Sequence, residues 1–322
     1  MAENNETLPS APKEGPFPPV IATISIITVI GNLLVIVTLC KKPRSELRIV
    51  YNYLVLNLAT ADLMVGLVGE PLWISLYWVD DDDGVSLVMS NPPSAFNITS
   101  RSVLVIAATA SRCTLLFITL ERYVALEMPL RREKLFSGIA LKFYILLIWL
   151  YALVTTLLTS FHDTEAFRLV LYPIAQFELV VIFVLYMRMF IIIRKFNEAL
   201  LANRVREPLI QTGHAYRLAR KREYSLAKDM FFLVGAYVLC FLPLSITRSV
   251  ECFASERVKI TFNTAELLKI IYVSKCAIDP VLYTFIIRSY RWQVKRLFYK
   301  VAKAFAEILF TSNGAGNVQY TN

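Results

Sequence analysis

Seven apolar runs follow one another along this chain of 322 residues, and each is long enough to cross a membrane. A helix needs about 20 apolar residues to span roughly 30 Å of hydrocarbon. Because a backbone in lipid must satisfy its hydrogen bonds internally, we expect each run to be helical. The sequence therefore predicts an all-α membrane protein, a seven-transmembrane helix bundle. The runs lie at Val20–Cys40, Val50–Val79, Ile98–Leu126, Leu135–Thr159, Leu171–Ile193, Ala227–Val250 and Thr264–Ile287.

Composition and charge agree with a multi-pass membrane protein. The chain is 56% hydrophobic and only 18% charged, which is too apolar for an ordinary soluble domain. Basic residues gather in the loops after the first, third and fifth runs, and Asp80–Asp83 lie on the opposite side. Positive loops stay in the cytosol, so we expect an extracellular N-terminus at the plasma membrane. The net charge of +9 is then a topology signal and an attraction to acidic membrane lipid, and no nucleic-acid partner is expected.

The runs divide the chain into four expected parts. Residues 1–19 form an extracellular tail, 20–288 the seven-helix domain, 289–310 a short amphipathic helix on the membrane surface, and 311–322 a cytoplasmic tail. No apolar signal segment precedes the first run. Two N-glycosylation sequons begin at Asn5 and Asn97, the second directly at the membrane.

Short motifs occur at matching depths of the expected helices. The third run ends in Glu121-Arg122-Tyr123, with Pro129-Leu130 after it, and the seventh ends in Asp279-Pro280-Val281-Leu282-Tyr283. Others are Gly31-Asn32, Leu56–Leu63, Trp149, Tyr186 and Cys240-Phe241-Leu242-Pro243. Together, from about Val20 to Phe305, the pattern resembles the rhodopsin-like (class A) G-protein-coupled receptors.

The resemblance implies an activation switch at the inner end of the bundle. Arg122 would contact the G protein, and at rest would pair with Glu121 and with Glu223 on the sixth helix. Leu130 would fill an apolar pocket of the G protein. Tyr186 and Tyr283 would move inward on activation. The remaining switch positions that the resemblance implies are Tyr123, Phe241, Pro243, Asp279 and Pro280.

Departures from the family pattern indicate which branch of the family the chain resembles. Asn97 stands where the family has a disulfide-bonded cysteine, Glu178 where it has a proline, and Phe241 where it has a tryptophan. These features resemble the melanocortin receptors and their relatives, the lysosphingolipid, cannabinoid and adenosine receptors. Leu104 replaces the aspartate that binds monoamines, so a peptide, lipid or nucleoside-like ligand is expected instead.

Lys275 and Asp279 lie four residues apart on the seventh helix and share a face. The resemblance places them, with Asp62 and Ser111, at the pocket that holds a sodium ion in related receptors. The Lys275 ammonium either replaces that sodium or only neutralises two carboxylates. A retinal Schiff base on Lys275, as in opsins, is a third interpretation, although the motif count places the opsin lysine at Val273.

Arg112 and Glu178 carry opposite charges at positions that touch in the resembled family. They either form a core ion pair or each find a polar partner or water. We expect no cofactor, no metal and no enzymatic activity. The functional hypothesis is a receptor that passes the signal of an unknown extracellular ligand to heterotrimeric G proteins. An opsin-like photoreceptor, or a transporter or channel, is the alternative.

Overall fold

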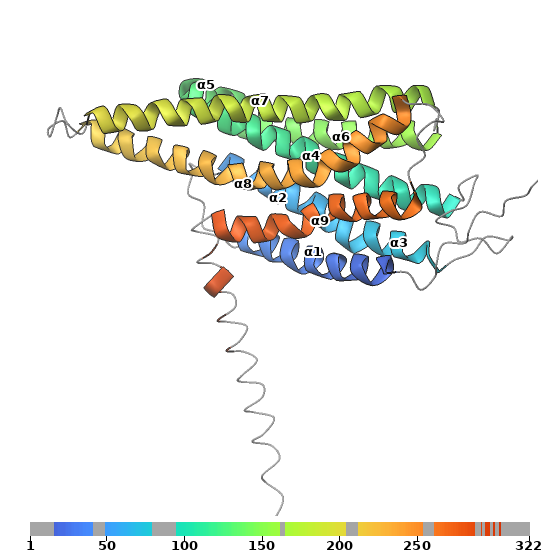
Figure 1. The fold of residues 1–322 in the computed structure, drawn as a ribbon. Coiled ribbons are helices and arrows are strands. Elements are labelled where there is room, and N and C mark those ends of the chain that lie inside the picture. The colour runs from blue at the N-terminus through green and yellow to red at the C-terminus, as the bar shows by residue number, and fades with distance from the viewer. Residues whose placement is uncertain are drawn as a thin grey trace, which may run out of the picture.

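The computed structural model describes residues 16–40, 49–78, 95–161, 165–203, 212–253 and 261–286, with isolated positions between 291 and 303. All regular structure in these ranges is helical, and the helices run side by side as a bundle (Figure 1). The helices are α1 (Phe17–Cys40), α2 (Ile49–Met64), a π-helical turn (Val65–Gly69), α3 (Glu70–Ser75), α4 (Ala95–Glu127), α5 (Pro129–Leu135), α6 (Gly138–Phe161), α7 (Glu165–Asn203), α8 (Thr212–Phe253) and α9 (Phe262–Ile286).

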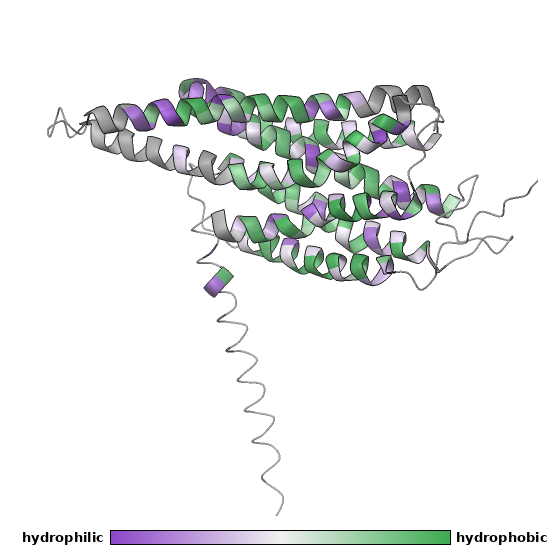
Figure 2. Cartoon of the chain, viewed as in Figure 1, coloured by the Kyte–Doolittle hydropathy of each residue, from purple (hydrophilic) through white to green (hydrophobic). Residues whose placement is uncertain are grey.

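Six of the described helical stretches are long and apolar enough to cross a membrane. They correspond to α1, to α2 with the π turn and α3, and to α4, α6, α7 and α8. The 25 residues of α9 include Glu266, Lys269, Lys275 and Asp279, and α9 is not among the six. Most of the amphipathic helix expected at 289–310 lies outside the described residues. Apolar residues cover the middle of the helices, and polar residues concentrate at α5 (Figure 2).

Helix α4 is the centre of the bundle and packs against α2, α6, α7 and α8. Helix α9, from the far end of the chain, packs between α1 and α8 (Figure 1). The contact of α1 with α9 is close because Gly31 has no side chain. A Cβ atom there would lie 2.9 Å from Cβ and Cγ of Pro280.

A π-helical turn interrupts the second expected run, which we had predicted as one continuous helix. The Glu70 N–H donates a hydrogen bond to the carbonyl of Val65, five residues back. Such a turn leaves a carbonyl without its usual helical partner. Here Ser25 Oγ of α1 donates to the Gly66 carbonyl at 2.7 Å. The π turn holds one residue more than an α-helical turn. The side chains after it are therefore rotated about the helix axis, compared with an uninterrupted α-helix.

Helices α7 and α8 are longer than the apolar runs that predicted them, with 39 and 42 residues. The C-terminal end of α7 and the N-terminal end of α8 project together beyond the rest of the bundle (Figure 1). Each contains a proline, Pro173 in α7 and Pro243 in α8. The additional turns are polar, so a search for apolar runs does not find them.

Candidate functional site

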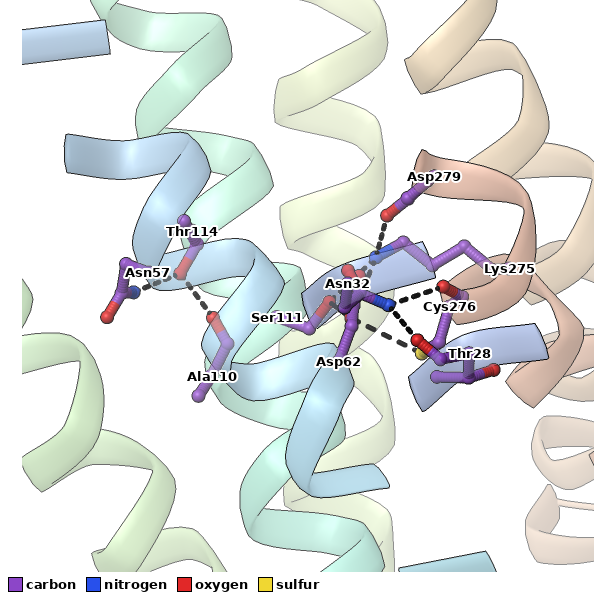
Figure 3. A network of polar contacts seen from close by, with 10 residues as sticks. All are labelled: Thr28, Asn32, Asn57, Asp62, Ala110, Ser111, Thr114, Lys275, Cys276 and Asp279. Carbon is purple, nitrogen blue, oxygen red and sulfur yellow. Dashed lines mark hydrogen bonds and ion pairs between the residues drawn. The ribbon is translucent and has the colours of Figure 1, made fainter. Parts of the chain in front are cut away.

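A buried polar network joins α1, α2, α4 and α9 at mid-depth (Figure 3). Asp62, on α2, accepts hydrogen bonds from Ser111 Oγ at 2.7 Å and from Cys276 Sγ at 3.2 Å. Asn32 of α1 donates from Nδ2 to the Cys276 carbonyl at 3.0 Å. The network therefore contains the two predicted residues Asp62 and Ser111, and it adds Asn32 and Cys276 to them.

Lys275 places its ammonium at the centre of this network. Its Nζ lies 2.7 Å from Asp279 Oδ2, 2.7 Å from Ser111 Oγ and 3.5 Å from Asp62 Oδ1. The lysine is 3% exposed and both aspartates are 0% exposed. All four residues predicted for this pocket therefore meet in one place. An ammonium occupies the space between the two carboxylates, and it is the group that a metal cation there would have to displace.

A second polar contact, nearer the N-terminal end of α2 than Asp62, ties α2 to α4 and α6. Asn57 donates from Nδ2 to Thr114 Oγ1 at 2.7 Å and accepts from Trp149 Nε1 at 2.9 Å. Thr114 in turn donates to the Ala110 carbonyl at 2.6 Å (Figure 3). One asparagine thus fixes the relative positions of three helices.

Arg112 and Glu178 form an ion pair between α4 and α7. Arg112 Nε lies 2.8 Å from Glu178 Oε2, and each side chain is 11% exposed. The guanidinium also lies over the Phe241 ring of α8, with Cζ 5.9 Å from the ring centroid. Phe241 stacks on Tyr237 at 5.4 Å. The pair is therefore the meeting point of three helices, since Arg112 contacts both α7 and α8.

At the C-terminal end of α4, two arginines hold the carboxylate of Glu121. Arg122 Nε pairs with Glu121 Oε2, and Arg132 NH2 of α5 lies 2.8 Å from Glu121 Oε1. The Arg122 guanidinium also lies 5.0 Å from the ring centroid of Tyr51. Sequence reasoning missed Arg132, because it lies in a stretch read only as a basic loop. Its position three residues into the short helix α5 brings it back to Glu121.

The remaining predicted switch residues lie on several helices of the bundle. Leu130 of α5 is 90% exposed, whereas Tyr186 and Tyr283 are buried. Tyr123 is partly buried against the main apolar core. The side chain of Glu223 lies outside the described residues, so its expected contact with Arg122 has no geometry to report. Asn5 also lies outside them. Asn97 is 6% exposed in the first turn of α4, and its glycosylation stays a prediction.

The end of the bundle formed by α3 and the start of α9 holds a group of charged residues to which the sequence assigned no shared role. Tyr77 donates to Glu266 Oε2 at 2.7 Å, and Lys269 Nζ lies 2.5 Å from Glu266 Oε1. The Lys269 ammonium lies over the Trp73 ring, 5.8 Å from its centroid. Glu70 is fully buried on the same side of α3. Among the described residues, no cluster of His, Cys, Asp and Glu side chains forms a metal site.

Comparison with known proteins is consistent with this geometry. The profile of a family described as "7 transmembrane receptor (rhodopsin family)" matches residues 31–283. The chain is 24% identical to adenosine receptor A2a of Canis lupus familiaris over 305 residues, which cover 85% of this chain and 70% of that receptor. It is 24% identical to adenosine receptor A2b of Mus musculus over 334 residues, 91% of this chain and 92% of that receptor. It is 27% identical to neuromedin-U receptor 2 of Mus musculus over 305 residues, 84% and 72% of the two chains.

Proposed function

The chain belongs to the rhodopsin family of seven-transmembrane receptors, and from that premise we propose how its residues carry a signal through the membrane. It is a G-protein-coupled receptor in a branch near the adenosine receptors, and not an enzyme. It spans the membrane several times, and the family implies an extracellular ligand and a heterotrimeric G protein as partners. The opsin-like and transporter alternatives are not favoured, since the named relatives are adenosine and neuromedin-U receptors.

We propose that α9 is the seventh span. Its 25 residues extend about 37 Å, enough to cross the hydrocarbon core. Three of its charged residues, Glu266, Lys275 and Asp279, are buried in the bundle, so they do not face lipid. Seven spans put the two termini on opposite sides of the membrane, and the basic loops assign the N-terminus to the outside and α5 to the cytosol. The chain then divides as the sequence predicts: outer tail 1–19, receptor domain 20–288, surface helix 289–310 against membrane lipid, and tail 311–322. The basic loops face acidic lipid, and nucleic acid is not a partner.

The observation that carries the proposed mechanism is the position of Glu121 between two arginines. Arg122 is the residue that we assign to the G protein, and in this resting arrangement Glu121 holds it. Arg132 holds the other oxygen of the same carboxylate. Activation has to release Arg122, and Glu223 is proposed as its further partner at rest. Leu130, exposed on the neighbouring helix, is the apolar contact offered to the G protein. Tyr186, Tyr283 and the helix-bending residues Pro243 and Pro280 are proposed to move with this release.

The two buried charge networks lie between the ligand side and this inner switch. We assign Lys275 as a built-in cation that takes the place of sodium between Asp62 and Asp279. We assign the Arg112–Glu178 pair, with Phe241, as the contact that transmits movement among α4, α7 and α8. The ligand is proposed to be peptide, lipid or nucleoside-like. The names of the relatives, adenosine receptor and neuromedin-U receptor, fit that range.

Nucleotide exchange on Gα in membranes tests the proposed function. Membranes containing the receptor are expected to exchange nucleotide faster than control membranes, and Arg122→Ala should remove the increase. Arg248→Ala is the matched control, because Arg248 pairs with Glu251 at the opposite end of the bundle, at 2.8 Å. At equal surface expression, exchange that is unchanged by Arg122→Ala for every Gα class tried would refute the assignment of Arg122.

A further inference from the structure

Glu70 is a buried carboxylate with no partner among the residues that the structure describes. Its side chain is 0% exposed, and neither Oε1 nor Oε2 accepts a hydrogen bond from them. Burying such a group destabilises a fold whether the carboxyl is charged or neutral, because its bonds to water are lost without replacement. An unsatisfied buried group in a native fold therefore requires an explanation.

The backbone turns Glu70 into the bundle. In an α-helix, residue 70 would be rotated by about 80° from Asp62, since each residue advances about 100°. The π turn Val65–Gly69 absorbs one residue and brings Glu70 close to the face of Asp62. Gly69, just before it, packs so closely on α4 that a Cβ atom would lie 2.5 Å from Cδ2 of Leu104. π turns occur often at functional sites.

Among the described residues near α3, the outer half of the bundle contains more buried carboxyl groups than cationic groups. Glu70 and Glu266 are both buried, 0% and 1% exposed, and the Lys269 ammonium pairs with Glu266. Lys269 is bound to Glu266 Oε1, and Tyr77 donates to Oε2, so Glu266 is satisfied. Of the other charges described nearby, Asp62 is also negative, and Lys275 lies deeper and is committed to Asp279. Glu70 is therefore the carboxyl group of this set that has no cationic partner among the described residues.

The same face already accepts a cation. Trp73 follows Glu70 by three residues on α3, and its ring receives the Lys269 ammonium. An aromatic face beside a carboxylate is a favourable place for an organic cation. Glu70 lies five residues before Ser75, where α3 ends, which is a depth of about 8 Å along the helix axis. Glu70 therefore lies less than two helical turns from that end of α3.

We propose that Glu70 is the counter-ion for an ammonium or guanidinium group on the extracellular ligand. This proposal rests on the proposed receptor function and on an outer position for α3. It narrows the ligand to a molecule with an organic cation, such as a peptide with a basic side chain or a free amino terminus. The cationic group supplies the positive charge that Glu70 lacks as a partner, and it donates hydrogen bonds to Oε1 and Oε2 of Glu70.

A pair of probes that differ in charge and little in shape tests this directly. L-argininamide carries a guanidinium, and L-citrullinamide replaces it with a neutral urea. The unfolding midpoint of the purified receptor is measured against the concentration of each probe at constant ionic strength. A ligand that binds the folded state raises this midpoint. We expect argininamide to raise it and citrullinamide to leave it unchanged.

Two variants test whether argininamide binds at Glu70. Glu70→Gln keeps the shape and removes the charge, and should weaken argininamide binding about thirtyfold or more. Glu251→Gln is the matched control, because Glu251 is an outer acid already paired with Arg248, and should leave the binding unchanged. Equal shifts from both probes on the unchanged receptor, or no shift from either, would overturn the proposal, and this comparison needs no variant to fold. Binding that survives Glu70→Gln would overturn it as well.

The failure of this inference is separable from a failure of the proposed function. Basal nucleotide exchange on Gα depends on Arg122 and not on any cationic ligand. Exchange that is lost in Arg122→Ala, together with equal effects of the two probes, would leave the receptor function intact and remove Glu70 as a counter-ion. Argininamide binding without any nucleotide exchange would leave Glu70 as a counter-ion and remove the proposed receptor function.

Discussion

Each buried charge in this bundle can be judged by whether another group compensates it. Arg112 and Glu178 face each other across α4 and α7 at 2.8 Å, with little water access. Attraction within such a pair repays part of the desolvation of both groups. Removing one partner leaves the other charge stranded, whereas removing both leaves none. The stability of single and double variants therefore separates a pair from two independent polar residues.

We predict that Arg112→Ala or Glu178→Ala alone lowers the unfolding free energy by roughly 3–5 kcal/mol and reduces surface expression sharply. The double variant should recover much of the loss, because no uncompensated charge remains. The measurement is the unfolding midpoint and surface yield of all four proteins in a double-mutant cycle. Strictly additive losses would mean that the two side chains do not act as a pair.

At Lys275 we predict that sodium has little influence on this receptor. The ammonium lies between Asp62 and Asp279, so a metal ion would meet it at close range. Agonist affinity should be nearly independent of NaCl when a bulky organic cation keeps the ionic strength constant. Lys275→Asn frees both carboxylates and should introduce a sodium-induced loss of agonist affinity. A clear sodium effect in the unchanged receptor would contradict this assignment.

The sequence predicted some of these residues because their spacing is local. Lys275 and Asp279 are four apart on a helix, so their shared face follows from the helical period. Arg132 and Glu70 were not predictable in the same way. The contact of Arg132 with Glu121 depends on how α5 turns back on α4, and the burial of Glu70 depends on the π turn before it. A single apolar run gives no sign of either.

At the scale of helices, hydropathy predicted where the spans lie but not how they end or bend. The run Val20–Cys40 became α1, Phe17–Cys40, with nearly the same limits. The run Leu171–Ile193 became the much longer α7, Glu165–Asn203, because polar residues continue the helix outside the apolar part. The π turn at Val65–Gly69 was missed, since one additional residue in a turn leaves the apolar pattern almost unchanged.

Close packing of α1 on α9 makes Gly31 a sensitive position. We predict that Gly31→Ala lowers the unfolding free energy by roughly 1–3 kcal/mol, since its Cβ would lie 2.9 Å from the Pro280 ring. Gly138→Ala is the matched control: a Cβ atom there meets no atom within 4 Å. The readout is the unfolding midpoint of the purified proteins. A Gly31→Ala protein as stable as Gly138→Ala would show that α9 moves aside without loss.

At the scale of the whole molecule, we propose that the contacts of Glu121 hold the resting state and that activation breaks them. Arg132 connects α5 to Glu121, and through it to Arg122. We predict that Arg132→Ala raises basal nucleotide exchange several-fold, because the resting state loses a contact that the active state lacks. Arg131→Ala, at the neighbouring exposed position, should not change it. Basal exchange in Arg132→Ala that equals the value for Arg131→Ala, at matched expression, would assign Arg132 a role in folding alone.

The length of α8 has a mechanical consequence. Pro243 interrupts its hydrogen bonding and is the natural hinge of the helix. From Pro243 the helix runs about 46 Å back to Thr212 but only about 15 Å forward to Phe253. A tilt of α8 at Pro243 therefore moves the Thr212 end of the helix about three times as far as the Phe253 end. The Arg112 guanidinium lies over the ring of Phe241, which is two residues from Pro243. A rearrangement of the Arg112–Glu178 pair that tilts α8 at Pro243 would therefore displace the Thr212 end of the helix more than the Phe253 end.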